Sequence, residues 1–408
     1  MRYVIIGNSA AGVFAAQAIR RSDTTGTLTM LSEENYPVYA RCLTSYYLTG
    51  SLPEERLFIR PADFYAQHNI ALHTGQKVIR VDTKAKAVVS ASGQVFAYDK
   101  LLIATGASPV IPAIPGVTAQ GVSGLRTLEQ AKAIVARVKT ARQAVILGGG
   151  FVALKAAYAL RQAGLAVTCI ISSGQILSQI LDAVAAAEVA RVLTQQGITL
   201  RYGSEVTEIL QESGVVQGVG LGTGERLPAD IVICGKGVKP NTALLQHSGI
   251  AVAAGILVDT HLQTNLPDVY AAGDVAQATD VVTQQPKTNA LWPNAAEQGD
   301  IAGKNMAGVT TYYAGSLGMN SADFYGLSVI AAGEARAHGA NYAVIQLNQA
   351  PGVYRRLVFR DDKLVGYILV GQTAQAGVLT ALVKAGTKLS VEAREQLSQG
   401  RFKQAMLW

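Results

Sequence analysis

The first 33 residues constrain this chain more than any other stretch. Residues 2–6 form a short apolar run typical of a β-strand, Gly7-x-Ser9-x-x-Gly12 follows, and an alanine-rich helical stretch continues to Arg21. A second apolar strand ends just before Glu33. This arrangement suits a dinucleotide: the tight turn admits the pyrophosphate, the helix N-terminus points at it, and the acid accepts hydrogen bonds from the ribose. Because Ser9 replaces the usual middle glycine, the motif alone also fits an ordinary α/β turn.

The same pattern returns between residues 144 and 171. A strand (residues 144–147) leads into Gly148-x-Gly150-x-x-Ala153, a helix follows over residues 152–162, and another strand covers 167–171. The Gly-x-Gly-x-x-Ala form is an accepted dinucleotide variant. Two such units in one chain predict two dinucleotides, one in each of two domains.

Composition sets the limits of the other possibilities. The length of 408 residues and the 49% hydrophobic content predict two to three domains with large cores. No apolar run reaches 18 residues and no signal peptide is evident, so we expect no membrane span and a cytoplasmic location. Cys42, Cys169 and Cys234 share no metal or disulfide spacing, which predicts no metal site. The net charge of +7, without a basic–aromatic repeat, disfavours nucleic acid and favours anionic nucleotides and an acidic partner protein.

The remaining segments supply the rest of the architecture. We expect a helix from Cys42 to Leu48, and a packed helix of small residues from Trp292 to Gly308. Prolines after residue 108 suggest a domain crossing. A hairpin over residues 354–370 indicates a third, α+β domain, and its Arg355, Arg356 and Arg360 are expected to attract an acidic partner. Further strand-like runs cover residues 72–81, 87–89 and 98–103. Residues 230–240 hold a strand with a glycine-rich exit, and residues 256–274 hold a strand that ends in Ala-Ala-Gly-Asp.

The order of these motifs resembles a known family. The markers are GNSAAG at 7–12, YDKLLIATGASP at 98–109, LRTLEQA at 125–131, GGGFVA at 148–153, GKGVKPN at 235–241, TNLPDVYAAGDVA at 264–276 and WPNAAEQG at 292–299. Together they resemble the two-dinucleotide flavoprotein reductases of the pyridine nucleotide–disulfide oxidoreductase superfamily. Within it, the chain looks similar to NADH:rubredoxin and ferredoxin reductases, the flavin half of nitrite reductase, and NADH oxidases.

The resemblance implies an α/β fold with two Rossmann-like domains and a C-terminal α+β interface domain. An FAD-binding domain would combine residues 1–112 and 242–312, an NAD(P)-binding domain would occupy 113–241, and residues 313–408 would form an interface domain that often makes homodimers. A nicotinamide would donate hydride to the flavin, and electrons would then pass singly to a small ferredoxin- or rubredoxin-like protein.

Carried over residue by residue, the resemblance also implies the contacts of both cofactors. For FAD these are Gly7, Ser9, Ala10, Ala11 and Gly12 at the pyrophosphate, Glu33 at the adenosine ribose, the Val78 backbone at the adenine, Ala104, Thr105 and Gly106 along the cleft, Arg41 and Arg126 as further contacts, and Gly273 with Asp274 at the ribityl chain. For NAD(H) or NADP(H) they are Gly148, Gly150 and Gly237, with Lys155 tuning the nicotinamide side.

Departures from the family pattern leave alternatives open. No CxxC follows the first helix, which excludes a dithiol relay, and the first turn lacks the histidine of the flavin peroxidases. Lys155 stands where a glutamate is usual, and Ile171, Ser172 and Ser173 offer neither the acid of NADH enzymes nor the arginines of NADPH enzymes. The second site therefore binds either nucleotide, binds weakly, or has lost nicotinamide binding.

Cys42 separates the functional alternatives. Its spacing to Gly50 matches the single redox cysteine of NADH oxidases, whereas its tyrosine-rich flanks look like the rubredoxin reductases. The alternatives to a ferredoxin- or rubredoxin-linked reductase are an NADH oxidase or a coenzyme A- or thiol-disulfide reductase using Cys42, a reductase of a small acceptor, and a flavin electron-transfer subunit of a larger complex. Cys169 and Cys234 lie in apolar strand patterns and are expected to be inert.

Overall fold

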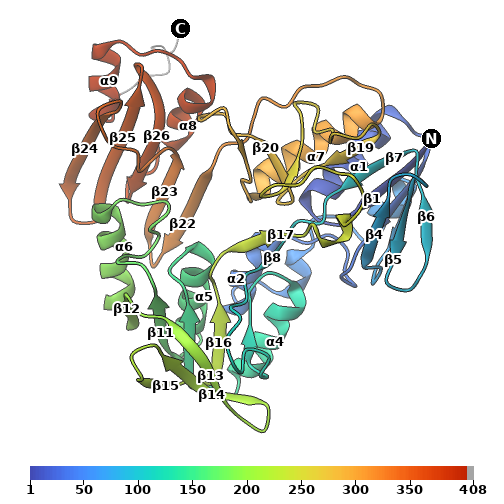
Figure 1. The fold of residues 1–408 in the computed structure, drawn as a ribbon. Helices are drawn as coiled ribbons and strands as arrows, with labels where there is room; N and C mark the ends of the chain where they lie inside the picture. The colour runs from blue at the N-terminus through green and yellow to red at the C-terminus, as the bar shows by residue number, and fades with distance from the viewer. Residues whose placement is uncertain (402–408) are drawn as a thin grey trace. The chain divides into compact units, whose positions relative to one another are not determined.

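The chain folds into two compact units that each combine separate stretches of sequence. In the computed structural model, which describes residues 1–401, unit 1 comprises Met1–Leu43, Leu52–Ser108 and Val238–Leu317 (Figure 1). Unit 2 comprises Thr44–Ser51, Pro109–Gly237 and the chain from Gly318 onward. Both units contain a five-stranded parallel sheet, and unit 2 also contains a five-stranded antiparallel sheet.

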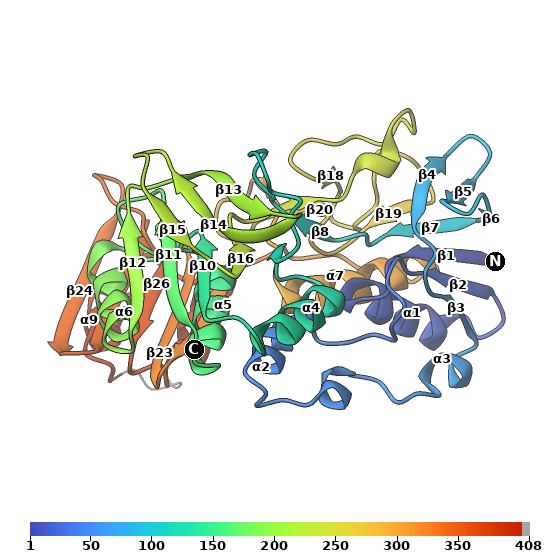
Figure 2. The same cartoon turned by 90° about the horizontal axis from the view of Figure 1, so that it is seen from below.

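The parallel sheet of unit 1 has the strand order β19–β7–β1–β2–β3. Helices α1 and α7 pack on one face, and the antiparallel sheet β4–β5–β6 covers the other (Figure 2). Because both faces are covered, the strands are nearly continuous apolar runs. The bounds are β1 Arg2–Ile6, α1 Ala10–Ser22, β2 Thr27–Leu31, β3 Ile70–His73, β4 Val78–Asp82, β5 Ala87–Ser90, β6 Val95–Ala97, β7 Lys100–Ile103, β19 Val269–Ala271 and α7 Trp292–Met306.

Helices α1 and α7 approach unusually closely because small residues line their contact. A Cβ on Gly299 would lie 2.2 Å from the carbonyl oxygen of Ala11, and one on Gly303 would lie 2.4 Å from that of Ala15. The expected helix of small residues at 292–308 is thus confirmed, and it fixes α1 in place.

The parallel sheet of unit 2 repeats the same plan. Its order is β12–β11–β10–β16–β9, with α4, α5 and α6 packed on one face and the antiparallel sheet β13–β14–β15 on the other. The bounds are β9 Val122–Ser123, α4 Leu128–Val138, β10 Gln143–Leu147, α5 Phe151–Gln162, β11 Ala166–Ile171, α6 Ala183–Gln195, β12 Ile198–Tyr202, β13 Val206–Glu212, β14 Val215–Leu221, β15 Arg226–Pro228 and β16 Ile231–Cys234.

The C-terminal part of unit 2 is an antiparallel sheet of order β22–β23–β26–β25–β24 with two helices. Asp182, the N-cap of α6, joins it to the parallel sheet's helices: the Tyr354 hydroxyl donates to its carboxylate, and Arg356 pairs with it at 3.5 Å. The bounds are β22 Met319–Phe324, β23 Leu327–Gly333, β24 Ala343–Ala350, β25 Val353–Arg360, β26 Lys363–Val370, α8 Ala376–Ala385 and α9 Val391–Ser398.

Short elements fill the connections. They are η1 Arg41–Leu43, α2 Thr44–Leu48, η2 Glu54–Leu57, α3 Phe64–Gln67, β8 Ala107–Pro109, β17 Val238–Pro240, η3 Ala243–Leu245, β18 Ile256–Leu257, β20 Ala276–Thr279 and β21 Pro286–Lys287.

Two expectations from the sequence are wrong. The single strand predicted over residues 72–81 is two strands in different sheets, because Gly75 adopts φ +66° and turns the chain between β3 and β4. Arg355 and Arg356 do not form a surface for a partner, since they are only 8% and 6% exposed. Arg355 donates to Gln375 and to the Leu397 carbonyl, while Arg356 donates to the carbonyls of Ala335 and Ala337.

Candidate functional site

The first glycine turn packs directly against the carboxyl end of a neighbouring strand. Gly7 has φ +123°, and a Cβ there would lie 2.1 Å from the carbonyl oxygen of Ala104, which follows β7. A Cβ on Gly12 would lie 1.9 Å from the Gly7 carbonyl oxygen. Only glycine fits at either position. The packing of the protein therefore fixes the conformation of the turn, and no side chain covers its backbone at these two positions.

The N-terminus of α1 has no side-chain cap. Ser9 is the N-cap residue but makes no hydrogen bond to the helix, and the first turn contains no acid. Elsewhere in the chain, Thr127 caps α4 and Asp182 caps α6 through their side chains. The first N–H groups of α1 therefore face outward with a positive partial charge, which is the setting that binds a phosphate group.

A guanidinium lies beside this helix end. Arg41 Nε lies 3.3 Å from Ser9 Oγ, and Arg41 forms an ion pair with Glu34. The Tyr39 hydroxyl donates to Glu34 at 2.6 Å and accepts from Arg41 at 3.0 Å. The sequence singled out Arg41 but missed Glu34 and Tyr39, which fix its orientation; the only available signal was their closeness to Arg41 in the chain.

Glu33 lies just beyond the carboxyl end of β2, as the motif predicts. Its carboxylate is 64% exposed and pairs with Lys77 at 2.8 Å. Val78, the first residue of β4, is buried on the opposite face of the sheet from α1, in the cluster that includes Leu31. The acid is thus accessible to a ligand at this edge, and a surface ion pair of this kind opens at little cost.

Two loops at the same edge carry the other residues singled out in unit 1. The Thr105 hydroxyl donates to the Asn241 carbonyl at 2.8 Å, and Gly106 turns the chain with φ +66°. At the end of β19, Gly273 has φ +81° and its N–H donates to Gln298 Oε1 at 2.8 Å. Gln298 is a buried side chain of α7 that positions the loop before Asp274, and the sequence did not assign it this role.

These residues come from four strand ends at one edge of the sheet. The turn after β1 meets Ala104 after β7, Glu33 follows β2, and Asp274 follows β19. In open α/β sheets, ligands bind outside the carboxyl ends of the strands. Apart from Arg126, the residues that were predicted to contact FAD are therefore gathered in unit 1, as a dinucleotide site requires.

The second glycine turn repeats the construction in unit 2. Gly148 has φ +120°, and a Cβ there would lie 2.5 Å from the Gly235 carbonyl oxygen after β16. Gly150 is the N-cap of α5, again without a side-chain cap or an acid in the first turn. Gly237 has φ +96°, and Lys155 lies on α5, half-buried. Arg126 also belongs to this unit. It lies just before α4, and its backbone N–H donates to Gln130 of that helix.

The adenosine end of this second site lacks a charge from β11. Ile171 is 1% exposed and packs on the glycine turn, since a Cβ on Gly149 would lie 3.2 Å from Ile171 Cγ2. The Ser173 hydroxyl donates to the Gln175 carbonyl at 2.8 Å. The structure therefore places an apolar side chain and two serines where an acid or arginines discriminate the nucleotides in related enzymes.

The three cysteines have different surroundings, and none forms a disulfide. Cys42 is exposed on the short helical turn that also carries Arg41. Burial raises the pKa of Cys169 to about 12 and that of Cys234 to about 11. The expectation that the two strand cysteines lie in the core is confirmed by their burial, and their inertness stays a prediction that this burial supports.

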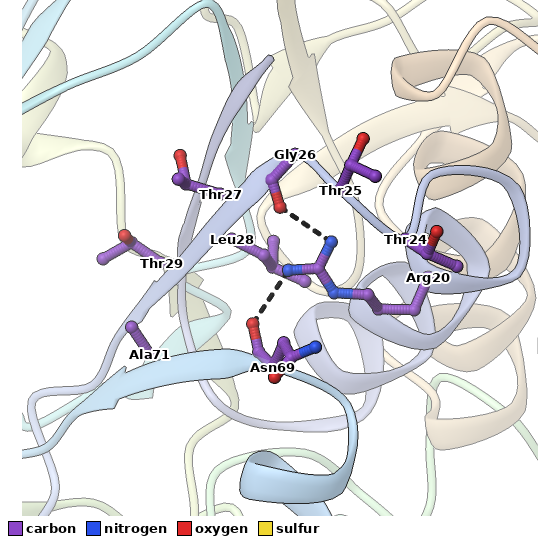
Figure 3. A pocket seen from close by; sticks show the side chains of 9 residues that line it. All are labelled: Arg20, Thr24, Thr25, Gly26, Thr27, Leu28, Thr29, Asn69 and Ala71. Atoms are coloured by element: carbon purple, nitrogen blue, oxygen red, sulfur yellow. Dashed lines mark hydrogen bonds between the residues drawn. The ribbon is translucent and has the colours of Figure 1, made fainter.

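Unit 1 also has a pocket of about 320 Å³ at the opposite edge of its sheet, near the amino ends of β2 and β3 (Figure 3). Arg20 is the charged side chain among the residues that line this pocket. Its guanidinium already donates to the carbonyls of Asp23, Gly26, His68 and Asn69. This arginine ties α1 to the sheet. Within residues 1–401, no three histidine, cysteine or acidic side chains gather as metal ligands, and no helix has the length and apolar character to cross a bilayer.

Residues 1–299 match the family model described as pyridine nucleotide-disulphide oxidoreductase. The chain belongs to this family. Residues 319–387 match a second model, the rubredoxin NAD+ reductase C-terminal domain. The expected fold class is confirmed, and members of this family bind FAD and NAD(H) or NADPH.

Relatives and solved structures cover nearly the whole chain. It is 33% identical over 392 residues to the NADH-dependent phenylglyoxylate dehydrogenase subunit epsilon of Aromatoleum evansii, covering 95% of this chain and 93% of that one. It is 30% identical to a Bacillus subtilis nitrite reductase, covering 97% of this chain but only 49% of the relative, about half its length. A ferredoxin reductase from Rhodopseudomonas palustris superposes with a TM-score of 0.87 at 25% identity, covering 96% of both chains.

The chain is thus an FAD-dependent NAD(P)H oxidoreductase. Its geometry fits both cofactors, because each glycine turn packs against a neighbouring strand end too closely to admit a Cβ, and each following helix presents uncapped N–H groups. Two independently built anion sites are what two dinucleotides require.

Proposed function

We propose that this chain carries electrons from NAD(P)H through FAD to a small, acidic ferredoxin- or rubredoxin-type protein. The observation that carries the proposal is the pair of glycine turns with uncapped helices, together with a C-terminal sheet of the rubredoxin NAD+ reductase type. The net charge of +7 supports an acidic partner, since opposite charges raise association rates.

In this proposal the residues of unit 1 hold FAD and those of unit 2 hold the nicotinamide. The α1 N-terminus and Arg41 bind the FAD pyrophosphate, Glu33 the adenosine ribose and Asp274 the ribityl chain. The α5 N-terminus binds the NAD(P)H pyrophosphate, and Lys155 lies near the nicotinamide. The proposed boundaries are 1–112 with 242–312 for FAD, 113–241 for NAD(P) and 313–408 for the interface domain. The two-part FAD domain gains support from unit 1, which is built from sequence on both sides of unit 2's parallel sheet.

FAD supplies the conversion between a two-electron hydride donor and a one-electron acceptor. The chain's own residues bind and orient the two dinucleotides. Gln298 holds the Gly273 N–H, and Glu34 and Tyr39 hold the Arg41 guanidinium. These contacts need no nucleophilic side chain, so the protein acts through position and electrostatics.

The direct test is anaerobic stopped-flow absorbance of the yellow holoprotein. NADH should bleach the flavin band, and the reduced protein should then reduce an acidic ferredoxin or rubredoxin at a rate that falls steeply with added salt. A colourless protein that FAD does not reconstitute would overturn the cofactor assignment. Transfer rates that are insensitive to ionic strength would overturn the acidic partner.

A second candidate is a flavin-carrying subunit that docks into a larger complex and no longer reacts with nicotinamide. The buried Ile171 at the end of β11 favours the loss of nicotinamide reactivity. The similarity to a subunit of an NADH-dependent dehydrogenase favours only the docking into a larger complex. Failure of both NADH and NADPH to bleach the flavin would select this candidate. Lys155→Glu should then restore bleaching if the lysine is what impairs the site.

Cys42 distinguishes electron transfer from thiol or oxidase chemistry. We expect reductive titration to need two electrons per flavin, with no long-wavelength thiolate–flavin band, and Cys42→Ser to keep most electron transfer. A requirement for four electrons, lost in Cys42→Ser, would place the protein with the NADH oxidases and disulfide reductases. The matched control is native thiol labelling, in which Cys42 alone should react because Cys169 and Cys234 are buried.

We also infer a cytoplasmic homodimer. The three cysteines, none of which is in a disulfide, suit a reducing compartment. Strand β24 is the edge of the C-terminal sheet and is mostly exposed, which leaves backbone groups for a second copy. Light scattering at several protein concentrations tests the dimer, and a mass of one chain throughout would exclude it.

A further inference from the structure

Two opposite charges lie at the carboxyl edge of the parallel sheet in unit 2. Lys236 follows β16, one residue beyond Gly235, and Glu205 lies in the turn between β12 and β13. Their side chains reach toward each other, with 3.6 Å between Lys236 Nζ and Glu205 Oε1. Neither residue belongs to the glycine turn or to the end of β11.

The backbone contacts place this pair beside the second dinucleotide site. The Ser204 N–H donates to the Ile171 carbonyl at 3.3 Å, so Glu205 lies next to the end of β11. On the other side, the backbone nitrogen of Lys236 would lie 3.6 Å from a Cβ on Gly148. In the sheet, β11 and β10 lie between β12 and β16 (Figure 2). Glu205 follows β12 and Lys236 follows β16, so their ion pair spans the ends of β11 and β10.

The Glu205 side of this pair adjoins the position from which a dinucleotide fold reads the adenosine ribose. In such folds the strand after the glycine-turn helix ends at the ribose, and its last residue contacts the 2′ position. Here that strand is β11, which ends in the buried Ile171, and Ser173 Oγ is already bonded to the Gln175 carbonyl. Two ion pairs lie at this edge among the described residues: Arg201 with Glu225, and Lys236 with Glu205. The second pair is the looser one, at 3.6 Å.

We propose that Glu205 and Lys236 together read the 2′ position of the adenosine ribose, an inference that rests on the proposed nicotinamide site. Glu205 accepts a hydrogen bond from the 2′-hydroxyl of NADH. Lys236 pairs with the 2′-phosphate of NADPH, from which Glu205 turns away. One position therefore carries an acceptor for the first nucleotide and a cation for the second.

The geometry of the pair explains how both nucleotides are admitted. A separation of 3.6 Å is longer than a charge-assisted hydrogen bond, and the side chain of Glu205 is 63% exposed against 28% for Lys236. Such a pair is weak and opens readily. The more exposed Glu205 side chain can move outward, whereas the less exposed Lys236 side chain stays near the second glycine turn. The result is a modest preference between NADH and NADPH rather than a strict one.

The test compares two variants that change one charge each, Glu205→Gln and Lys236→Met, in the FAD-loaded protein. Calorimetry measures the binding of ADP-ribose and of its 2′-phosphate, and stopped flow measures flavin reduction by NADH and NADPH. Lys236→Met should weaken the phosphorylated ligand about tenfold and leave ADP-ribose within about twofold. Glu205→Gln should do the opposite, weakening ADP-ribose and tightening the phosphorylated ligand. Lys239→Met controls for a general loss of positive charge.

Three results would count against the proposal. Equal effects of each variant on both ligands, or no effect on either, would refute the reading of the 2′ position while leaving the nicotinamide site intact. A change in Lys239→Met as large as that in Lys236→Met would show a general charge effect and refute it as well. Failure of the unaltered protein to bind either ligand would overturn both this inference and the proposed function of unit 2.

Discussion

The contact between α1 and α7 should be intolerant of a single added methyl group. Gly299→Ala places a Cβ 2.2 Å from the Ala11 carbonyl oxygen, 2.8 Å from its carbonyl carbon and 2.8 Å from its Cα. Ordinary contact begins near 3.4 Å, so the helices must separate by about 1 Å. The neighbouring Gln298, which holds the loop before Asp274, must move with α7.

The size of the effect follows from two opposing contributions. Replacing a glycine inside a helix by alanine stabilises the helix by about 1 kcal/mol. Overpacking of a close backbone contact costs about 1–3 kcal/mol. We therefore expect a net loss of up to about 2 kcal/mol in unit 1, equivalent to about 2–4 °C in the melting midpoint for each kcal/mol, and a weaker hold on FAD.

The assay is thermal unfolding followed by flavin fluorescence, which reports FAD release, and by circular dichroism. Gly377→Ala is the matched control, because Gly377 lies in α8 and its added Cβ meets no atom within 4 Å. It should gain the helix contribution without the clash. If Gly299→Ala releases FAD at or above the temperature of the unaltered protein, the argument that this glycine sets the helix spacing is wrong.

Three further predictions concern single side chains. Glu33→Ala should weaken FAD retention by about 1–3 kcal/mol, measured by dialysis, because the ribose loses its acceptor, whereas Lys77→Ala should have little effect. Arg356→Ala should lower the stability of unit 2 by about 1–3 kcal/mol, since buried carbonyls and Asp182 lose their donor, while the more exposed Arg360→Ala should cost under about 1 kcal/mol in the same denaturation experiment. Hydrogen bonds from the Arg2 side chain and backbone lower the pKa of Asp99 from 3.8 to about 2. The ionised carboxylate therefore stabilises the fold above about pH 4, and this stabilisation is lost as the pH falls from about 4 to about 2. The melting midpoint of Asp99→Asn should fall less steeply over that range than the midpoint of the unaltered protein.

The local architecture of both dinucleotide units was predictable from the sequence. The strands and helices around Gly7 and Gly148 lie within one residue of their expected bounds. The reason is physical, because a glycine turn between an apolar strand and an alanine-rich helix has few other ways to bury its faces. The hairpin over residues 354–370 was predictable for the same reason, as two apolar runs flank Asp361 and Asp362, both with positive φ.

Long-range contacts were not predictable. Gln298 holds the Gly273 N–H across 25 residues of chain, and no spacing in the sequence signals this contact. Arg355 and Arg356 were expected to attract an acidic partner because of their positive charge. In β25 both faces are covered, so each arginine is buried on its own side. Sequence patterns specify which face of an element is apolar, but not what lies against the other face.

The division of unit 1 into separate stretches has a consequence for how the protein is made. On the ribosome, Met1–Leu43 and Leu52–Ser108 emerge first, but β19, Asp274 and α7 belong to Val238–Leu317. Until that stretch emerges, the small-residue face of α1 has no partner and the FAD site lacks one wall. The parallel sheet of unit 2 is contiguous and is complete earlier. We therefore expect the nicotinamide half to fold during synthesis while the flavin half waits, leaving nascent unit 1 the more dependent on chaperones.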